Sequence, residues 1–93
     1  MATDKVRYQI TFRGRVQGVG FRYRAQFAAQ EYGVTGWVRN EYDGTVSMEA
    51  QGRPEDIRRM ISSLENDRWI RIDEKTVTQT VPVEGETRFR VTG

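Results

Sequence analysis

Apolar and polar positions alternate along the first part of the chain and then change period. Apolar residues occupy every second position from Val6 to Phe12, which is typical of a strand with one buried face. From residue 21 the apolar spacing becomes helical and ends before a glycine that suits a helix C-terminus, in the set Phe21, Ala25, Ala28, Tyr32 and Gly33. The chain therefore starts with a strand that is followed by a helix.

The middle of the chain predicts a hairpin and a second helix. Strands are expected at residues 34–40 and 45–51, and the Asp43-Gly44 pair between them indicates a hairpin. Pro54 suits the first position of a helix, and an apolar stripe runs from Ile57 to Leu64 at helical spacing. These elements supply two adjacent strands and one more helix that can cover them.

The last third of the chain predicts two more strands. One begins near Ile70 and Ile72, but the alternation slips at Val77, where we expect a bulge or a break. Pro82 indicates that the next segment follows a sheet edge or leaves the sheet, and Phe89 with Val91 predicts a short final strand. The order predicts an α+β, ferredoxin-like βαββαβ sandwich, in which two helices cover one face of an antiparallel sheet with a short extra C-terminal strand. Because this fold hosts enzymes, RNA binders and regulatory modules, it leaves function open.

Composition limits the chemistry that is available. Ninety-three residues make one domain spanning 1–93, and no apolar run approaches the roughly 20 residues of a membrane span. The N-terminus lacks the apolar segment of a signal peptide, so we expect a cytoplasmic monomer without membrane contact. The chain has no cysteine and no histidine, so thiolate chemistry, disulfides and the commonest metal ligands are excluded, and no metal or cofactor is expected.

A glycine-rich segment lies between the first strand and the first helix. Residues 14–22 have the sequence Gly-Arg-Val-Gln-Gly-Val-Gly-Phe-Arg, and backbone N–H groups at such a helix start can surround an anion. Arg22 adds a planar set of donors that suits two phosphate oxygens. Residues 5–30 contain no Asp or Glu but several cations, namely Lys5, Arg7, Arg13, Arg15, Arg22 and Arg24. The alternative is a simple strand-to-helix turn that needs glycine for backbone reasons, beside a solvated basic face.

Two blocks of sequence together resemble the acylphosphatase family. They are Arg15-Val-Gln-Gly-Val-Gly-Phe-Arg22, and Gly36-Trp37-Val38-Arg39-Asn40 followed by Asp43-Gly44-Thr45-Val46. The resemblance implies an enzyme that hydrolyses the carboxyl–phosphate bond of acyl phosphates, with inorganic phosphate or sulfate as a competing anion. It implies that Asn40 holds the attacking water and that phosphate is bound by Arg22 and the loop of Arg15, Val16, Gln17, Gly18, Val19, Gly20 and Phe21.

The residues suit this chemistry, although binding alone remains an alternative. A carboxylate leaves as a stable anion, so positioning and charge stabilisation suffice and no histidine is needed. Asn40 also precedes a hairpin turn, where asparagine serves turn formation. A non-catalytic anion- or RNA-binding module shares the fold, but the glycine-aromatic motif of RNA-recognition domains lies on a central strand, whereas Gly18 to Tyr23 follows the first strand. We therefore expect no nucleic-acid partner.

Overall fold

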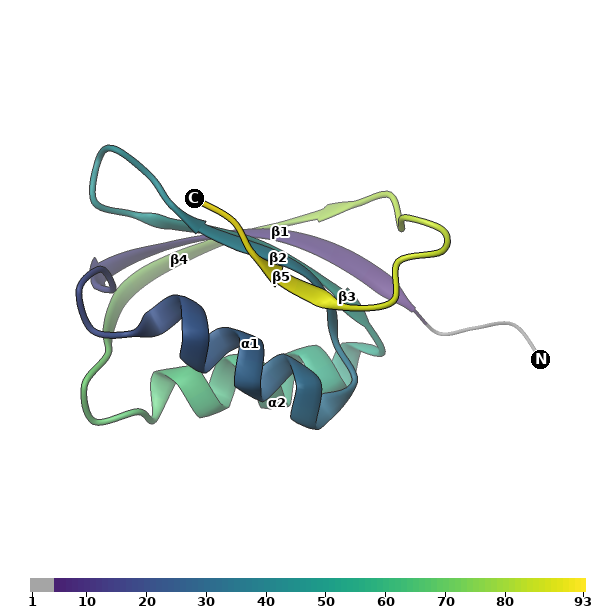
Figure 1. Cartoon of the computed structure of the whole chain (residues 1–93), viewed down its shortest axis with the longest axis horizontal. Helices are drawn as coiled ribbons and strands as arrows, with labels where there is room; N and C mark the ends of the chain where they lie inside the picture. Colours follow the sequence, from purple (N-terminus) through teal and green to yellow (C-terminus); the bar gives the residue numbers. More distant parts are fainter. Residues whose placement is uncertain (1–4) are drawn as a thin grey trace.

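Two helices cover one face of a five-stranded sheet in the computed structural model, which describes residues 5–93 (Figure 1). The strand order is β4-β1-β3-β2-β5, and the first and second helices are the two that were predicted. The elements in chain order are β1 (Val6–Arg15), α1 (Phe21–Tyr32), β2 (Thr35–Asn40), β3 (Val46–Gly52), α2 (Pro54–Glu65), β4 (Arg71–Thr80) and β5 (Phe89–Val91). The predicted α+β, ferredoxin-like sandwich with an extra C-terminal strand is confirmed.

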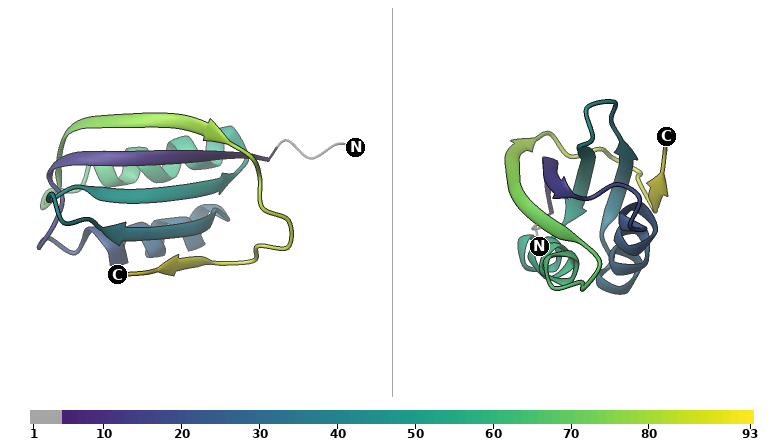
Figure 2. Two further views of the ribbon diagram at one scale, coloured as in Figure 1. Left: turned by 90° about the horizontal axis from the view of Figure 1, so that it is seen from above. Right: turned by 90° about the vertical axis from the view of Figure 1, so that its left-hand side faces the viewer.

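The sheet is mixed, because its last strand runs parallel to its neighbour. The pairs β4–β1, β1–β3 and β3–β2 are antiparallel, as predicted. β5 pairs with β2 in parallel, with Gly36 opposite Phe89 and Val38 opposite Val91. The chain leaves the end of β4, passes the ends of the other strands through residues 81–88, and returns along β2 (Figure 2, left). As Pro82 indicated, this connecting segment lies outside the sheet.

The core lies between the helices and the sheet (Figure 2, right). The alternating residues of β1 and β3 face it, and Ile10, Phe12 and Met48 are fully buried. From the helices it receives Phe21, Ala25, Ala28, Ala29, Ile57, Met60, Ile61 and Leu64. The Phe12 and Phe21 rings stand 5.0 Å apart, so the beginning of α1 is packed directly onto β1. The period of two in the strands and the helical period elsewhere thus place their apolar residues as predicted.

The irregularity of β4 lies at Asp73, so the prediction of a bulge or a break at Val77 is wrong. Arg13 pairs with Glu74 and Gly14 with Ile72, which leaves Asp73 as an extra residue, whereas pairing continues regularly through Val77. One extra residue shifts the alternation, so Ile72 and Val77 share a face although their spacing is odd. A Cβ on Gly14 would lie 2.3 Å from the Arg71 carbonyl oxygen, so glycine is required at this close approach.

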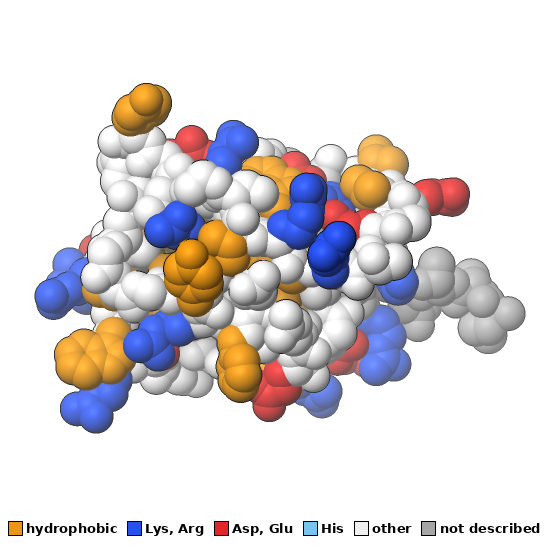
Figure 3. All heavy atoms as spheres, in the orientation of Figure 1, with side chains coloured by type: hydrophobic (Ala, Val, Ile, Leu, Met, Phe, Trp, Pro, Cys, Tyr) orange, Lys and Arg blue, Asp and Glu red, His pale blue; other side chains and the backbone are white. Residues whose placement is uncertain are grey.

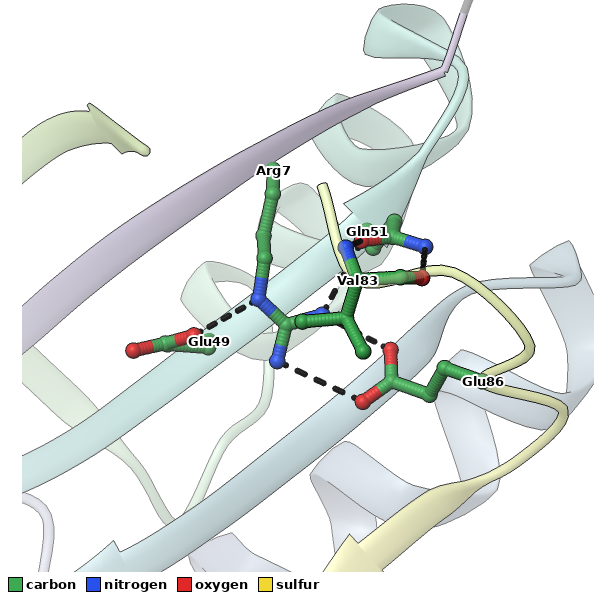
Figure 4. Close-up of polar contacts among 5 residues, drawn as sticks. All are labelled: Arg7, Glu49, Gln51, Val83 and Glu86. Atoms are coloured by element: carbon green, nitrogen blue, oxygen red, sulfur yellow. Dashed lines mark hydrogen bonds and ion pairs between the residues drawn. The ribbon is translucent and has the colours of Figure 1, made fainter. Parts of the chain in front are cut away.

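A buried arginine fastens the 81–88 segment to the open face of the sheet (Figure 4). Arg7 is 2% exposed; its guanidinium donates to Glu49 at 2.6 Å, to Gln51 at 3.1 Å and to Glu86 at 2.8 Å. Burial by itself would lower the pKa of Arg7, but the hydrogen bonds that Arg7 donates to Glu86 and Glu49 outweigh it and raise that pKa. Gln51 also binds both backbone polar groups of Val83. These contacts fix the start of β5.

Replacing Arg7 with methionine is expected to lower the free energy of unfolding by about 3–5 kcal/mol, because two carboxylates would lose their buried cation. Urea denaturation measures the change. The matched control is Arg13→Met on the same strand, where the side chain is half exposed and its nitrogen lies 3.8 Å from Glu74. The control should lose less than about 1 kcal/mol. Equal small losses in both variants would contradict the role given to Arg7.

Candidate active site

The two predicted site segments meet at one edge of the sheet. β1 and β2 both pair antiparallel with β3, so they run in the same direction and their C-terminal ends lie at the same edge. Loop 15–21 follows β1, and Asn40 is the last residue of β2. Asn40 pairs with Val46, which is fully buried under the helices, and paired residues share a face of a sheet. Asn40 therefore lies on the side of the sheet that carries the loop and α1.

Loop 15–21 is anchored near both ends, and two glycines between the anchors are left-handed. Val16 and Phe21 are 1% and 2% exposed, which holds the loop against the core. Gly18 and Gly20 have φ angles of 76° and 78°, a region that favours glycine. Left-handed residues placed in this way turn neighbouring backbone N–H groups to one side, which makes an anion-binding concavity.

The beginning of α1 leaves its N–H groups without a side-chain cap. Gly20 occupies the capping position and makes no side-chain hydrogen bond, and no acidic residue lies in the first turn. Arg24 supports this turn, since its Nη1 lies 2.9 Å from Asp67 and its Nε donates to the Val19 carbonyl at 3.3 Å. Uncapped N–H groups and the helix dipole favour a bound anion here.

Arg22 is held beside β2 by Gly93, which follows β5. Its Nη1 donates to the Gly93 carbonyl oxygen at 2.8 Å. Thr92 donates its backbone N–H to Val38 at 2.8 Å, so the last residues of the described chain lie along β2. The half-buried Arg22 thus extends from α1 toward the strand that ends in Asn40. A cation in the first turn of a helix is opposed by the helix dipole, and an anionic ligand would offset that cost.

The hairpin turn after Asn40 is stabilised by other residues. Asp43 accepts hydrogen bonds from the backbone N–H and the hydroxyl of Thr45, at 3.0 and 2.7 Å. The Glu41 N–H donates to the Thr45 carbonyl at 2.9 Å. The side chain of Asn40 makes no hydrogen bond with any residue between 5 and 93. Its amide is therefore available to water or to a ligand, and turn formation does not account for it.

The side chain of Gln17 joins the loop to this hairpin, a contact that the sequence did not reveal. Its Nε2 donates to the carbonyl oxygens of Glu41 and Thr45, each at 2.8 Å. The sequence predicted only a backbone role for Gln17 in the loop. No pattern in the sequence marks a side chain whose partners are backbone carbonyls 24 and 28 residues away.

Two carboxylates of the hairpin that follows Asn40, Glu41 and Asp43, have lowered pKa values and are ionised at neutral pH. Hydrogen bonds from Arg39 and then Ser47 lower the pKa of Glu41, and those from Thr45 lower the pKa of Asp43. Neither group therefore offers a proton to a leaving group. Within residues 5–93, His, Cys, Asp and Glu side chains form no group of three that is able to hold a metal ion. No helix in this range is both long and apolar enough to cross a bilayer.

Comparison with known proteins identifies the family. The acylphosphatase family model matches residues 8–91. An acylphosphatase from Bacillus licheniformis is 36% identical over 87 residues, which cover 92% of this chain and 97% of that protein. The crystal structure of the acylphosphatase from Bacillus subtilis matches with a TM-score of 0.86 and 34% identity, over 95% of this chain and 99% of that one. An acylphosphatase structure from Coxiella burnetii gives 0.84 and 30%, over 96% and 94%. The resemblance seen in the two sequence blocks thus extends over nearly the whole chain, which belongs to the acylphosphatase family of hydrolases.

Proposed function

We propose that the protein hydrolyses acyl phosphates to a carboxylate and inorganic phosphate by in-line attack of water on phosphorus. Loop 15–21 and Arg22 bind the phosphoryl group, and Asn40 positions the water. One observation carries the proposal: the unengaged amide of Asn40 lies at the same sheet edge, and on the same face, as an uncapped helix start with a left-handed glycine loop.

The phosphoryl group is bound mainly by backbone. The N–H groups of the loop and the first turn of α1 match the phosphoryl oxygens, which share negative charge in the transition state. Gly18 and Gly20 provide the left-handed angles of the loop, and apart from its two chain neighbours no residue places an atom within 4 Å of where a Gly18 Cβ would be. Arg22 adds a fixed cation whose planar shape suits two of the oxygens. Inorganic phosphate and sulfate would occupy the same cradle and compete.

Asn40 orients the nucleophile without removing its proton. Its amide oxygen accepts a hydrogen bond from water and its nitrogen donates one, so the lone pair of the water can face phosphorus. As the oxygen–phosphorus bond forms, the bond from phosphorus to the acyl oxygen breaks and a carboxylate departs. The proton of the water passes to a phosphoryl oxygen of the substrate. No step needs a protein acid, which agrees with the lowered pKa values of Glu41 and Asp43.

A paired assay tests this proposal. Purified protein is given acetyl phosphate in one reaction and an alkyl phosphate monoester in another, both in the presence of EDTA. Acetyl phosphate should be hydrolysed, and the monoester should react slower by at least the ~10²–10⁴-fold that general acid help typically supplies. The monoester should still inhibit, since its phosphoryl end resembles that of the substrate. Comparable rates on both substrates, or inactivation by EDTA that Mg²⁺ reverses, would contradict the mechanism.

A further inference from the structure

The side chain of Gln17 links the two halves of the site. It leaves the phosphate-binding loop and inserts its Nε2 between the carbonyl oxygens of Glu41 and Thr45, at 2.8 Å from each. Both carbonyls belong to the hairpin that follows Asn40. A primary amide has two N–H donors on one nitrogen, so one side chain satisfies both carbonyls at once.

The carbonyls of Glu41 and Thr45 also accept the backbone hydrogen bonds that close the hairpin turn. The Thr45 carbonyl accepts the N–H of Glu41 at 2.9 Å, and the Glu41 carbonyl accepts the N–H of Gly44 at 3.3 Å. Gln17 therefore binds the hairpin at its base, one residue beyond Asn40, rather than at its exposed tip. The tip itself is solvent-facing, because Tyr42 is fully exposed, and this end of the hairpin projects from the molecular surface (Figure 3). Any movement of the loop relative to the base of the hairpin would break these hydrogen bonds.

In the proposed mechanism, the separation between the attacking water and phosphorus depends on how loop 15–21 lies relative to the hairpin. Loop 15–21 fixes the phosphoryl group, and Asn40 fixes the water, but no backbone hydrogen bond joins the loop directly to the hairpin among residues 5–93. In-line attack requires the reacting atoms to lie at about 3–3.5 Å and in line, and a displacement of about 1 Å costs on the order of a hundredfold in rate.

We propose that Gln17 is a positioning residue, which sets the separation and the angle between the bound phosphoryl group and the water held by Asn40. The inference rests on the proposed function, because it assigns the two halves of the site to those ligands. Gln17 acts through Asn40 and the loop and touches no reacting atom. Its side chain is needed for turnover and not for phosphate binding, which the loop N–H groups and Arg22 still supply.

The test uses Gln17→Met, which keeps the length of the side chain and removes both donors. Steady-state hydrolysis of acetyl phosphate gives kcat, and inhibition by inorganic phosphate gives Ki. We expect kcat to fall by about 30- to 100-fold and Ki to change by less than about threefold. The matched control is Gln26→Met on α1. This variant loses a single hydrogen bond, of 3.2 Å to the Phe89 carbonyl, which does not involve the hairpin. The control should keep kcat within about threefold of the parent.

A double-mutant cycle distinguishes positioning from general damage. If Gln17 acts through Asn40, Gln17→Met should have little further effect on kcat in an Asn40→Ala background. Independent, multiplying effects would overturn the inference, as would a parent-like kcat in Gln17→Met or a loss in Ki that equals the loss in kcat. Absence of acetyl phosphate hydrolysis in the parent protein would instead contradict the proposed function, and this inference with it.

Discussion

Replacing Asn40 with alanine is expected to remove most turnover and to leave phosphate binding almost unchanged. The side-chain amide of Asn40 makes no hydrogen bond within residues 5–93, so removing that side chain leaves no protein group unpaired. Its proposed partner is the attacking water, and loss of that orientation should lower kcat by on the order of a hundredfold or more. Hydrolysis of acetyl phosphate measures kcat, and competition by inorganic phosphate measures Ki.

The control for Asn40 is Asn66→Ala at the end of α2. Asn66 is exposed and makes one long side-chain hydrogen bond, of 3.4 Å to Ser62. This variant should keep both kcat and Ki near the parent values. Equal losses of kcat and of phosphate affinity in Asn40→Ala would show that Asn40 contacts the phosphoryl group instead of the water.

Replacing Arg22 with alanine is expected to weaken both turnover and phosphate binding. The guanidinium is the fixed cation at the beginning of α1, where no acidic residue lies in the first turn. Loss of one preorganised donor from such a site typically costs ~10²–10³-fold in rate. Arg22→Lys should recover only part of this, because an ammonium cannot present two parallel donors to a phosphoryl group.

Arg13→Ala separates a specific contact from the general positive field. It removes the same charge from an exposed position on β1. Its effect on kcat/KM should be small and should vanish at high salt, whereas the effect of Arg22→Ala should persist. An Arg22→Ala protein that folds as judged by circular dichroism and retains near-parent activity would exclude Arg22 from the phosphoryl cradle.

Local chemistry made most of the fold predictable from the sequence. The alternation in β1, the helical spacing in α1 and the Asp43-Gly44 turn each arise from neighbouring residues, and the structure places them as predicted. The later strands depend on distant partners. The extra residue of β4 lies at Asp73 because Gly14 permits a close approach there, and Gly14 is far away in the sequence. The parallel pairing of β5 likewise follows from a segment that Arg7 fastens to the sheet.

The backbone conformation of the glycine-rich segment was predictable from the sequence. Gly18 and Gly20 adopt the left-handed angles that a glycine-rich loop predicts, and Phe21 begins the helix behind them. The side chain of Gln17 was not predictable, since backbone carbonyls carry no sequence signal. The contact between Arg22 and Gly93 was hidden for the same reason, because it depends on where β5 ends in space. The roles of Arg22, Asn40 and the loop in catalysis remain predictions that the variants test.

One measurement tests the central claim, attack of water on phosphorus, most directly. Acetyl phosphate is hydrolysed by the protein in water enriched in heavy oxygen, and mass spectrometry locates the label in the two products. Under the proposed mechanism Asn40 directs water at a phosphoryl group held by loop 15–21, so the solvent oxygen should appear in inorganic phosphate. Solvent oxygen in the acetate would instead mean attack at the carbonyl carbon and would contradict the mechanism.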